Sequence, residues 1–111
     1  MREIKFNFYD NITKKYIRWE ESNASMSMSA FITHEHLEFL QYTGLKDKNG
    51  RDIYEGDITD LGVIYHINGC FMVGVEEDIN KSHVLPYGVY KGFSVIGNIY
   101  ENPELLVGSS V

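Results

Sequence analysis

One short stretch of the chain, YTGLKDKNGRDIYEGD (Tyr42–Asp57), combines charges, glycines and tyrosines in a way that could serve ligand binding or chemistry. Its charged side chains sum to −1, from Lys46, Lys48 and Arg51 against Asp47, Asp52, Glu55 and Asp57. A phosphate-binding loop would need exposed amides in a positive field, and the glycine and lysine spacing of a P-loop is missing. Asn49-Gly50 predicts a tight turn, and Ile53 and Ile58 predict core anchors. We therefore interpret the stretch as a loop that leads into a buried strand.

The same stretch offers one small contact surface. Lys46, Lys48 and Arg51 supply cations close in sequence to the aromatic ring of Tyr54, and small barrels hold single-stranded nucleic acids with cations and aromatic rings. We predict these four residues as a contact for a partner protein or for nucleic acid. The formal net charge of −6 argues against nucleic-acid binding over a broad surface, because such binding depends on neutralising phosphates.

Histidine and cysteine side chains form no catalytic or metal-binding pattern in the sequence. His34 and His36 would share one face of a strand, but no cysteine or carboxylate cluster accompanies them at metal-ligand spacing. Cys70 has His66 only as a diagonal neighbour and lacks the glycine-rich turn of a nucleophile elbow. We expect Cys70 to be a small buried hydrophobic side chain. The sequence predicts no catalytic residue, no metal ligand and no cofactor.

The composition indicates a globular protein with a hydrophobic core. The chain has 111 residues, of which 43% are hydrophobic and 14% aromatic, and this length is typical of one domain. Its single cysteine cannot form an intramolecular disulfide, which favours a reducing compartment. No stretch approaches the ~20 apolar residues of a membrane-spanning helix. We expect a cytoplasmic protein without membrane contact.

Alternating side chains predict a β-hairpin at the start of the chain. In EIKFNFY, residues 3–9, apolar side chains at Ile4, Phe6 and Phe8 alternate with polar ones, as in a half-buried strand. Turn residues follow, and KKYIRW, residues 14–19, predicts a second strand that ends at Trp19.

The connection after this hairpin is less regular. Its serines and small side chains predict a loop or variable segment over residues 20–36. Over HEHLEFLQY, residues 34–42, a helix capped by Thr33 and an alternating strand both fit the pattern, and periodicity does not decide between them.

The strongest pattern in the chain is GVIYHINGCFMVGV, residues 62–75. Asn68-Gly69 lies between two β-rich runs and most readily adopts the positive φ angles of a type I′ turn. The expected register pairs Ile67 with Cys70, His66 with Phe71, Tyr65 with Met72 and Ile64 with Val73. Both faces are largely apolar, and such a strand is covered on both sides. We expect either the N-terminal hairpin or another subunit to supply the cover.

After this hairpin one further strand is expected. EEDINKSH, residues 76–83, is polar and predicts a loop, and LPYGVYKG, residues 85–92, contains a proline and glycines that suit turns and sheet edges. FSVIGNIY, residues 93–100, predicts the last strand. Asn102 is expected to cap a short helical turn with Pro103 at its first position, and the terminal GSSV to fray.

Three blocks, MREIKFNFYDN, QYTGLKDKNGRDIYEGDI and VIGNIYENPELL, together resemble the YopX-like family of small proteins encoded by phages and prophages of Gram-positive bacteria. The resemblance spans nearly the whole chain, although Ser22 to His36 depart from it. It implies a mainly β fold: a small SH3-like β-barrel with an additional N-terminal β-hairpin element and little helix. We expect one YopX-like domain over 1–111, comprising the hairpin 1–19, a variable connection 20–36, a barrel core 37–102 and a tail 103–111.

The resemblance implies no established activity and no catalytic residues. Our first hypothesis is a non-enzymatic phage or prophage accessory protein that self-associates or binds a host or phage protein in the host cytoplasm. The alternative is a nucleic-acid-binding accessory factor that uses the small barrel surface around Lys46, Lys48, Arg51 and Tyr54. The doubly apolar hairpin favours the first hypothesis and a homo-oligomer.

Overall fold

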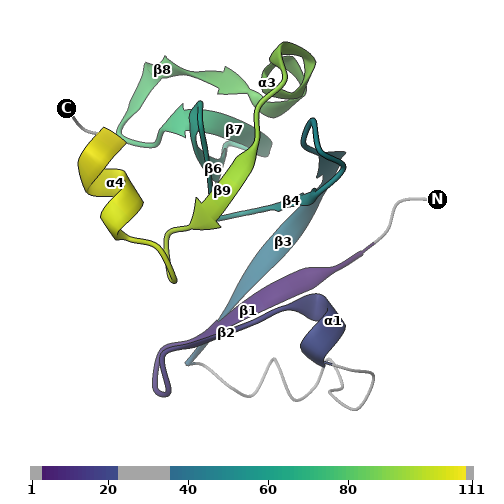
Figure 1. Cartoon of the computed structure of the whole chain (residues 1–111), viewed down its shortest axis with the longest axis vertical. Helices are drawn as coiled ribbons and strands as arrows, with labels where there is room; N and C mark the ends of the chain where they lie inside the picture. The colour runs from purple at the N-terminus through teal and green to yellow at the C-terminus, as the bar shows by residue number, and fades with distance from the viewer. Residues whose placement is uncertain (1–3, 23–35, 110–111) are drawn as a thin grey trace.

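Two β-sheets and a long strand that runs between them organise the protein (Figure 1). The structure is a computed structural model and describes residues 4–22 and 36–109. Its strands are β1 Phe6–Asp10, β2 Lys15–Ile17, β3 Leu37–Lys46, β4 Asp52–Tyr54, β5 Asp57–Thr59, β6 Gly62–Ile67, β7 Cys70–Val75, β8 Asp78–Val84 and β9 Val95–Asn98. Its helices are α1 Trp19–Ser22, α3 Leu85–Lys91 and α4 Glu104–Ser109.

The N-terminal sheet has the strand order β2-β1-β3-β4. The predicted hairpin is present, with Tyr9 paired with Tyr16 across β1 and β2. Strand β3 lies on the other side of β1, where Phe8 pairs with Phe39 and their rings meet edge to face, 5.5 Å apart. From Leu37 onward the strand interpretation is therefore correct and the helix is wrong, while Thr33 lies outside the described residues.

The second strand of the hairpin is shorter than predicted. It ends at Ile17, and Trp19 begins the short helix α1 instead of ending a strand. Asn7 explains the change of direction, because its side chain accepts a hydrogen bond from the Trp19 N–H (2.9 Å) and donates one to the Tyr16 hydroxyl (2.9 Å). A polar side chain expected on the solvent face is thereby buried.

The second sheet has five strands in the order β8-β7-β6-β5-β9. Its central hairpin has the predicted register, from Ile64 opposite Val73 to Ile67 opposite Cys70. The turn residues Asn68 and Gly69 adopt φ angles of 50° and 80°, as a type I′ turn requires.

The side chains on the two faces of this hairpin are buried mainly in the middle of its strands. Ile64 and Val73 are buried on one face, and Tyr65 and Met72 on the other. Towards the tip, the side chains become exposed. The expectation that Cys70 is buried is wrong, because it lies next to the turn, beyond the reach of the core.

After the hairpin β6–β7, two segments that were expected to be loops or turns form a strand and a helix. Residues 78–84 form the strand β8, whose pattern is polar because it is an edge strand exposed over most of its length. Residues 85–91 form the helix α3 despite Pro86, which lies in the first turn, where its missing N–H is not needed. Leu85 is fully buried, and Val89, one helical turn later, packs against the same core.

The main core lies between the five-stranded sheet, β4 and α3. Its buried members come from segments far apart in the sequence: Ile53, Ile64, Val73, Leu85, Phe93 and Val95. Burial of one such side chain contributes roughly 1.5–3 kcal/mol. Ile53 is thus a core anchor as predicted, and Ile58 is also buried.

The C-terminal part is more helical than expected. Helix α4 continues to Ser109, so two residues of the segment expected to fray are helical. The Asn102 side chain does not cap this helix, because its Oδ1 accepts a hydrogen bond from the Asn98 N–H (3.1 Å). The backbone carbonyl of Asn102 accepts the Leu105 N–H (3.0 Å).

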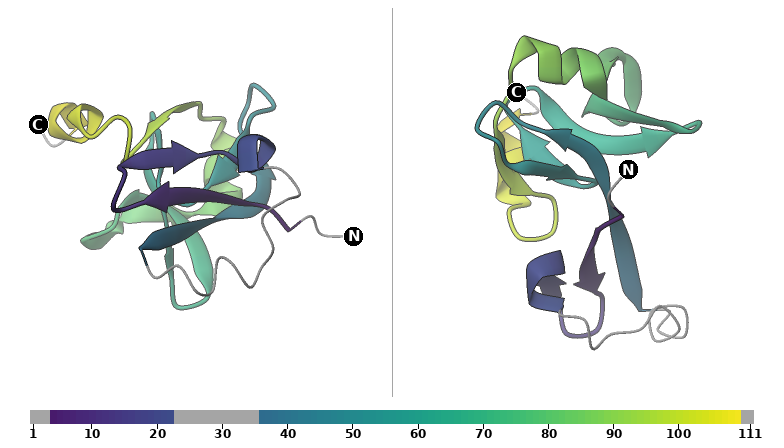
Figure 2. Two further views of the ribbon diagram at one scale, coloured as in Figure 1. Left: turned by 90° about the horizontal axis from the view of Figure 1, so that it is seen from below. Right: turned by 90° about the vertical axis from the view of Figure 1, so that its right-hand side faces the viewer.

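The predicted fold class is confirmed at the level of a mainly β protein with a small barrel-like sheet and an added N-terminal hairpin. Figure 2 shows the five-stranded sheet curling at one end, the hairpin and α1 at the other, and β3 running from one to the other. The curled sheet is open, with β8 and β9 as its edges. The SH3-like character and the domain divisions stay predictions.

The turn between β3 and β4 is fastened to the distant strand β9 by one carboxylate. Asp47 is buried and accepts hydrogen bonds from the N–H groups of Asn49, Arg51 and Val95, each at 2.9 Å. Burial alone would raise the pKa of Asp47, but these backbone hydrogen bonds outweigh it and hold the pKa below its ordinary value. The ionised carboxylate therefore stabilises the folded state.

We expect Asp47→Asn to lower the free energy of unfolding by about 2–3 kcal/mol, because an amide nitrogen replaces one of the two carboxylate oxygens that accept the backbone N–H groups, and a nitrogen that carries hydrogens cannot accept them. The folded pKa of Asp47 is lowered, so its contribution is present above about pH 4 and is lost as pH falls through the folded pKa. Chemical denaturation from neutral to acid pH measures both effects. Asp60→Asn is the control, because within the described part of the chain the exposed Asp60 side chain accepts one hydrogen bond, from the Ser94 N–H (3.0 Å). An equal loss in both variants would contradict the prediction.

Candidate functional site

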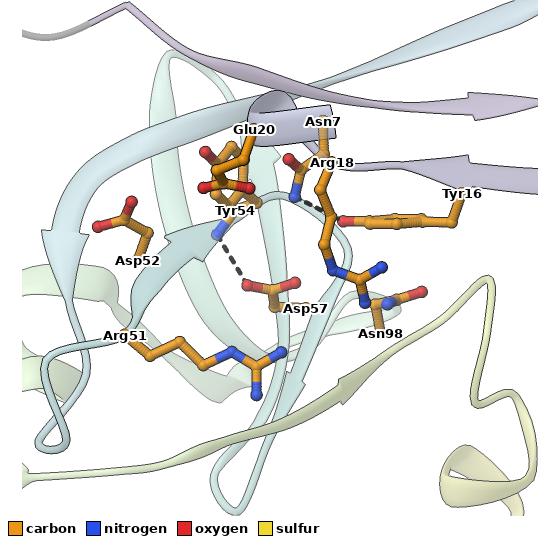
Figure 3. Close-up of a pocket in the computed structure, with 9 residues that line it drawn as sticks. All are labelled: Asn7, Tyr16, Arg18, Glu20, Arg51, Asp52, Tyr54, Asp57 and Asn98. Carbon is orange, nitrogen blue, oxygen red and sulfur yellow. Dashed lines mark hydrogen bonds between the residues drawn. The ribbon is translucent and has the colours of Figure 1, made fainter. Parts of the chain in front are cut away.

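A polar pocket with a volume of about 110 Å³ lies where the N-terminal sheet meets the five-stranded sheet. Its lining includes two arginines, three acidic side chains, two tyrosines and two asparagines (Figure 3). They are Asn7, Tyr16, Arg18, Glu20, Arg51, Asp52, Tyr54, Asp57 and Asn98. Because the first four come from the N-terminal hairpin and α1, the pocket exists only when both sheets are in place.

Contacts between the two sheets hold the walls of this pocket. The rings of Tyr9 and Tyr100 stack with centroids 4.4 Å apart, and Arg18 forms an ion pair with Glu101 (2.7 Å). The guanidinium of Arg18 also lies over the Tyr16 ring, 5.2 Å from its centroid. The half-exposed ion pair adds little stability by itself, so its main effect is to orient Arg18.

Asp57 lies at the centre of the pocket. It is only 6% exposed, and its Oδ2 accepts a hydrogen bond from the Tyr54 N–H (2.8 Å). Burial raises the pKa of Asp57 to about 7, although this hydrogen bond and the positive charges of Arg51 and Arg18 act in the opposite direction. The side chain therefore changes its charge near neutral pH.

Arg51 faces Asp57 from the turn before β4. Its backbone is fixed by two hydrogen bonds with Asp47, one to the side chain and one between the backbones, both 2.9 Å. Figure 3 shows the Asp57 carboxylate between the side chains of Arg51 and Arg18. Within the described residues, the Arg51 guanidinium forms no ion pair, and its positive charge acts to lower the pKa of the Asp57 carboxyl group that it faces.

Tyrosine hydroxyls supply further hydrogen-bonding groups. Tyr54 is only 5% exposed, and its hydroxyl has no hydrogen-bond partner among the described residues. Burial and the nearby Glu20 raise the pKa of Tyr54 above its ordinary value, so the hydroxyl keeps its proton. Burial likewise raises the pKa of Tyr16 to about 12. Both hydroxyls are therefore neutral donors at physiological pH.

Comparison with known proteins identifies the family. The family model described as YopX protein matches residues 2–107. The chain belongs to the YopX family. The crystal structure of protein EF1440 from Enterococcus faecalis is similar to this YopX-family chain at 27% identity, with a TM-score of 0.66, over 96% of this chain and 99% of the other. No curated protein matches the chain significantly.

The resemblance predicted from the sequence is thus correct, and neither matching description states an activity. No helix within the described part of this YopX-family chain is long and apolar enough to cross a membrane. Among residues 4–22 and 36–109, no group of three or more His, Cys, Asp or Glu side chains is placed to hold a metal ion. His34 lies outside these residues.

The four predicted contact residues do not form one surface in the YopX-family fold. Tyr54 is buried in β4, and its contact role stays a prediction. The ammonium of Lys46 is paired with Asp52, whose other oxygen binds Lys5 (2.7 Å). Lys48 is exposed outside the pocket, and Arg51 lines it. A contact role for Lys48 and Arg51 stays a prediction.

Sequence reasoning missed the pocket because its residues come from four separate stretches of the chain, at residues 7, 16–20, 51–57 and 98. The structure singles out Asp57, because it opens a strand, Asp57–Thr59, in which every residue is buried, and a buried carboxyl group is rarely without a special role or partner. That burial cannot be read from the sequence. Arg18 and Asn98 carry no comparable local pattern, since their importance comes from the pairing of distant strands.

We expect Asp57→Asn to change how stability depends on pH. The pKa of Asp57 is raised in the folded state, so protonated Asp57 favours folding. In the wild type this contribution to the free energy of unfolding is complete below about pH 4 and is lost as pH rises through about 7. Asparagine does not titrate, so the variant should gain stability relative to the wild type by up to about 1.4 kcal/mol per pH unit within this window.

Denaturation of both proteins at about pH 5 and about pH 8 measures the difference. Asp47→Asn is the matched control, because the pKa of Asp47 is lowered and its difference from the wild type should be constant over this range. A constant difference for Asp57→Asn as well would show that the pKa of Asp57 is not raised.

Proposed function

We propose that this YopX-family protein is a non-enzymatic interaction module of a phage or prophage, and that its first partner is a second copy of the same chain. It acts in the host cytoplasm, where it also binds a host or phage protein. The family membership supports the phage context, and an exposed apolar face of the five-stranded sheet supports the interaction.

The apolar face is formed by neighbouring strands β6, β7 and β8. Directly paired residues of antiparallel strands share a face, and the pairs Ile67–Cys70, Tyr65–Met72 and Met72–Val84 place all their members on one side. Met72 is buried, whereas Ile67 and Cys70 are exposed and Val84 is 51% exposed. We call Ile67, Cys70 and Val84 the apolar tip. Clustered apolar side chains of this kind favour association with another protein.

From the sequence we expected either the N-terminal hairpin or another subunit to cover the apolar hairpin β6–β7. The N-terminal hairpin lies at the opposite end of the molecule from β8 and α3 (Figure 1), so it does not cover the apolar tip. A second subunit is the remaining alternative. Because β8 is an edge strand, with Ile79 55% exposed on it, a second copy could also pair its backbone with that edge.

The placement of Cys70 supports a non-enzymatic role. A catalytic thiol needs a base and an enclosed site that orients the substrate. Cys70 is instead exposed at the tip of a hairpin and belongs to no part of the pocket lining.

The experiment is light scattering coupled to size exclusion at increasing protein concentration, in a reducing buffer so that Cys70 cannot cross-link copies. We expect the wild type to form a dimer or larger oligomer. Val84→Lys should shift association to at least about tenfold higher concentration, because a charge in a desolvated contact opposes docking.

Ile12→Lys is the matched control, since Ile12 is also exposed but lies in the turn of the N-terminal hairpin. It should associate like the wild type. A wild type that stays monomeric at every concentration, or equal behaviour of the two variants, would overturn the proposed self-association.

A further inference from the structure

We propose that the pocket between the two sheets binds one small oxyanion group, a carboxylate or a phosphate, held between Arg51 and Asp57. The apolar tip and the pocket lie on different parts of the fold, so this inference is independent of the proposed self-association. It is carried by the hydrogen-bonding groups of the pocket that have no partner among the residues that the structure describes.

Most free groups in the pocket are donors. The guanidinium of Arg51 has no ion pair among the described residues, and the buried Tyr54 hydroxyl has no hydrogen-bond partner there. Tyr16 accepts a hydrogen bond from Asn7 (2.9 Å), which leaves its own hydrogen available. A buried polar group without a partner is costly, and a ligand that accepts hydrogen bonds would remove that cost at Tyr54.

Most acceptors in the pocket are already used. The two Asp52 oxygens bind Lys5 and Lys46. Asn98 Oδ1 accepts the N–H groups of Tyr100 (3.0 Å) and Glu101 (2.8 Å). With partners counted only among residues 4–22 and 36–109, the acceptors that remain are one oxygen of Asp57 and the exposed carboxylate of Glu20. The pocket is therefore complementary to a group that mainly accepts hydrogen bonds.

The size of the pocket sets the size of the ligand group. Pockets for drug-sized ligands usually span roughly 300–1,000 Å³, and this one measures about 110 Å³. Since water occupies roughly 30 Å³ per molecule in the liquid, the space suits a single carboxylate or phosphate group. A guanidinium is the side chain best matched to either group, because its planar fork donates two parallel hydrogen bonds.

Asp57 makes this binding dependent on a proton. Groups that act on Asp57 are the cations Arg18 and Arg51, the hydroxyl of Tyr16 and the carboxylate of Asp47, with Glu20 and Asp52 in the same pocket lining. When protonated, Asp57 can donate a hydrogen bond to an oxyanion; when ionised, it repels one. Burial raises its pKa to about 7, so affinity falls as pH rises through neutrality.

The test is titration of the full chain with sodium acetate and with inorganic phosphate, followed by the amide resonances of Tyr54 and Asp57 at constant ionic strength in a chloride buffer. Both resonances should shift with saturation at one bound anion. Arg51→Gln should weaken binding about tenfold or more. Lys48→Gln, which removes the same charge from the same turn outside the pocket, should bind like the wild type.

Two further variants distinguish binding in this pocket from non-specific binding of anions to the protein surface. Tyr54→Phe removes only the hydroxyl and should weaken binding severalfold. In the wild type, acetate affinity should fall by up to about tenfold per pH unit above about pH 7, and Asp57→Asn should abolish this dependence. Amide spectra of each variant show that it is folded.

The relative affinities for acetate and phosphate identify whether the natural ligand group is a carboxylate or a phosphate. Resonance shifts that do not saturate, or an equal weakening by Arg51→Gln and Lys48→Gln, would overturn the proposal. An acetate affinity of the wild type that is the same on both sides of neutrality would overturn the role assigned to Asp57.

Discussion

The carboxylate of Asp47 is the interaction on which the arrangement of this protein most depends. It accepts three backbone N–H groups, two from its own turn and one from Val95 on a strand distant in sequence. The same carboxylate fixes the position of the Arg51 backbone, and it joins the turn after β3 to Val95, the first residue of β9. The ionised Asp47 side chain thus fixes the turn between β3 and β4, connects this turn to β9 and positions Arg51 in the lining of the pocket.

Local patterns in the sequence predicted those parts of the fold whose determinants are local. The hairpin around Asn68-Gly69 has the predicted register because its turn and its alternating side chains are both encoded within a few residues. Ile53 was predicted as a core residue because it is an apolar side chain in the stretch that directly follows the predicted Asn49-Gly50 turn. By contrast, β8 was missed because an exposed edge strand needs no apolar alternation, and α3 was missed because Pro86 suggested a turn although its position in the first helical turn is compatible with a helix.

The pocket could not be predicted from the sequence, because its residues become neighbours only through pairings between distant strands. Arg18 follows β2 of the N-terminal sheet, whereas Asp57 begins β5 of the other sheet. Alternation along β1 does not reveal that the Asn7 side chain accepts a hydrogen bond from the first residue of α1. The stretch Tyr42–Asp57 did point to the right part of the chain. It supplies Arg51, Asp52, Tyr54 and Asp57, although as walls of an inward-facing pocket rather than as an exposed surface.

The long separation between Asp47 and Val95, 48 residues along the chain, has a consequence for how the protein assembles. The hairpin β6–β7 closes locally and early, because short loops form faster than long-range contacts. The contact that orders the pocket loop forms only after the intervening strands have folded. In the native protein we expect the same region to open first, so that brief local unfolding exposes the buried Asp57 while the central hairpin stays paired.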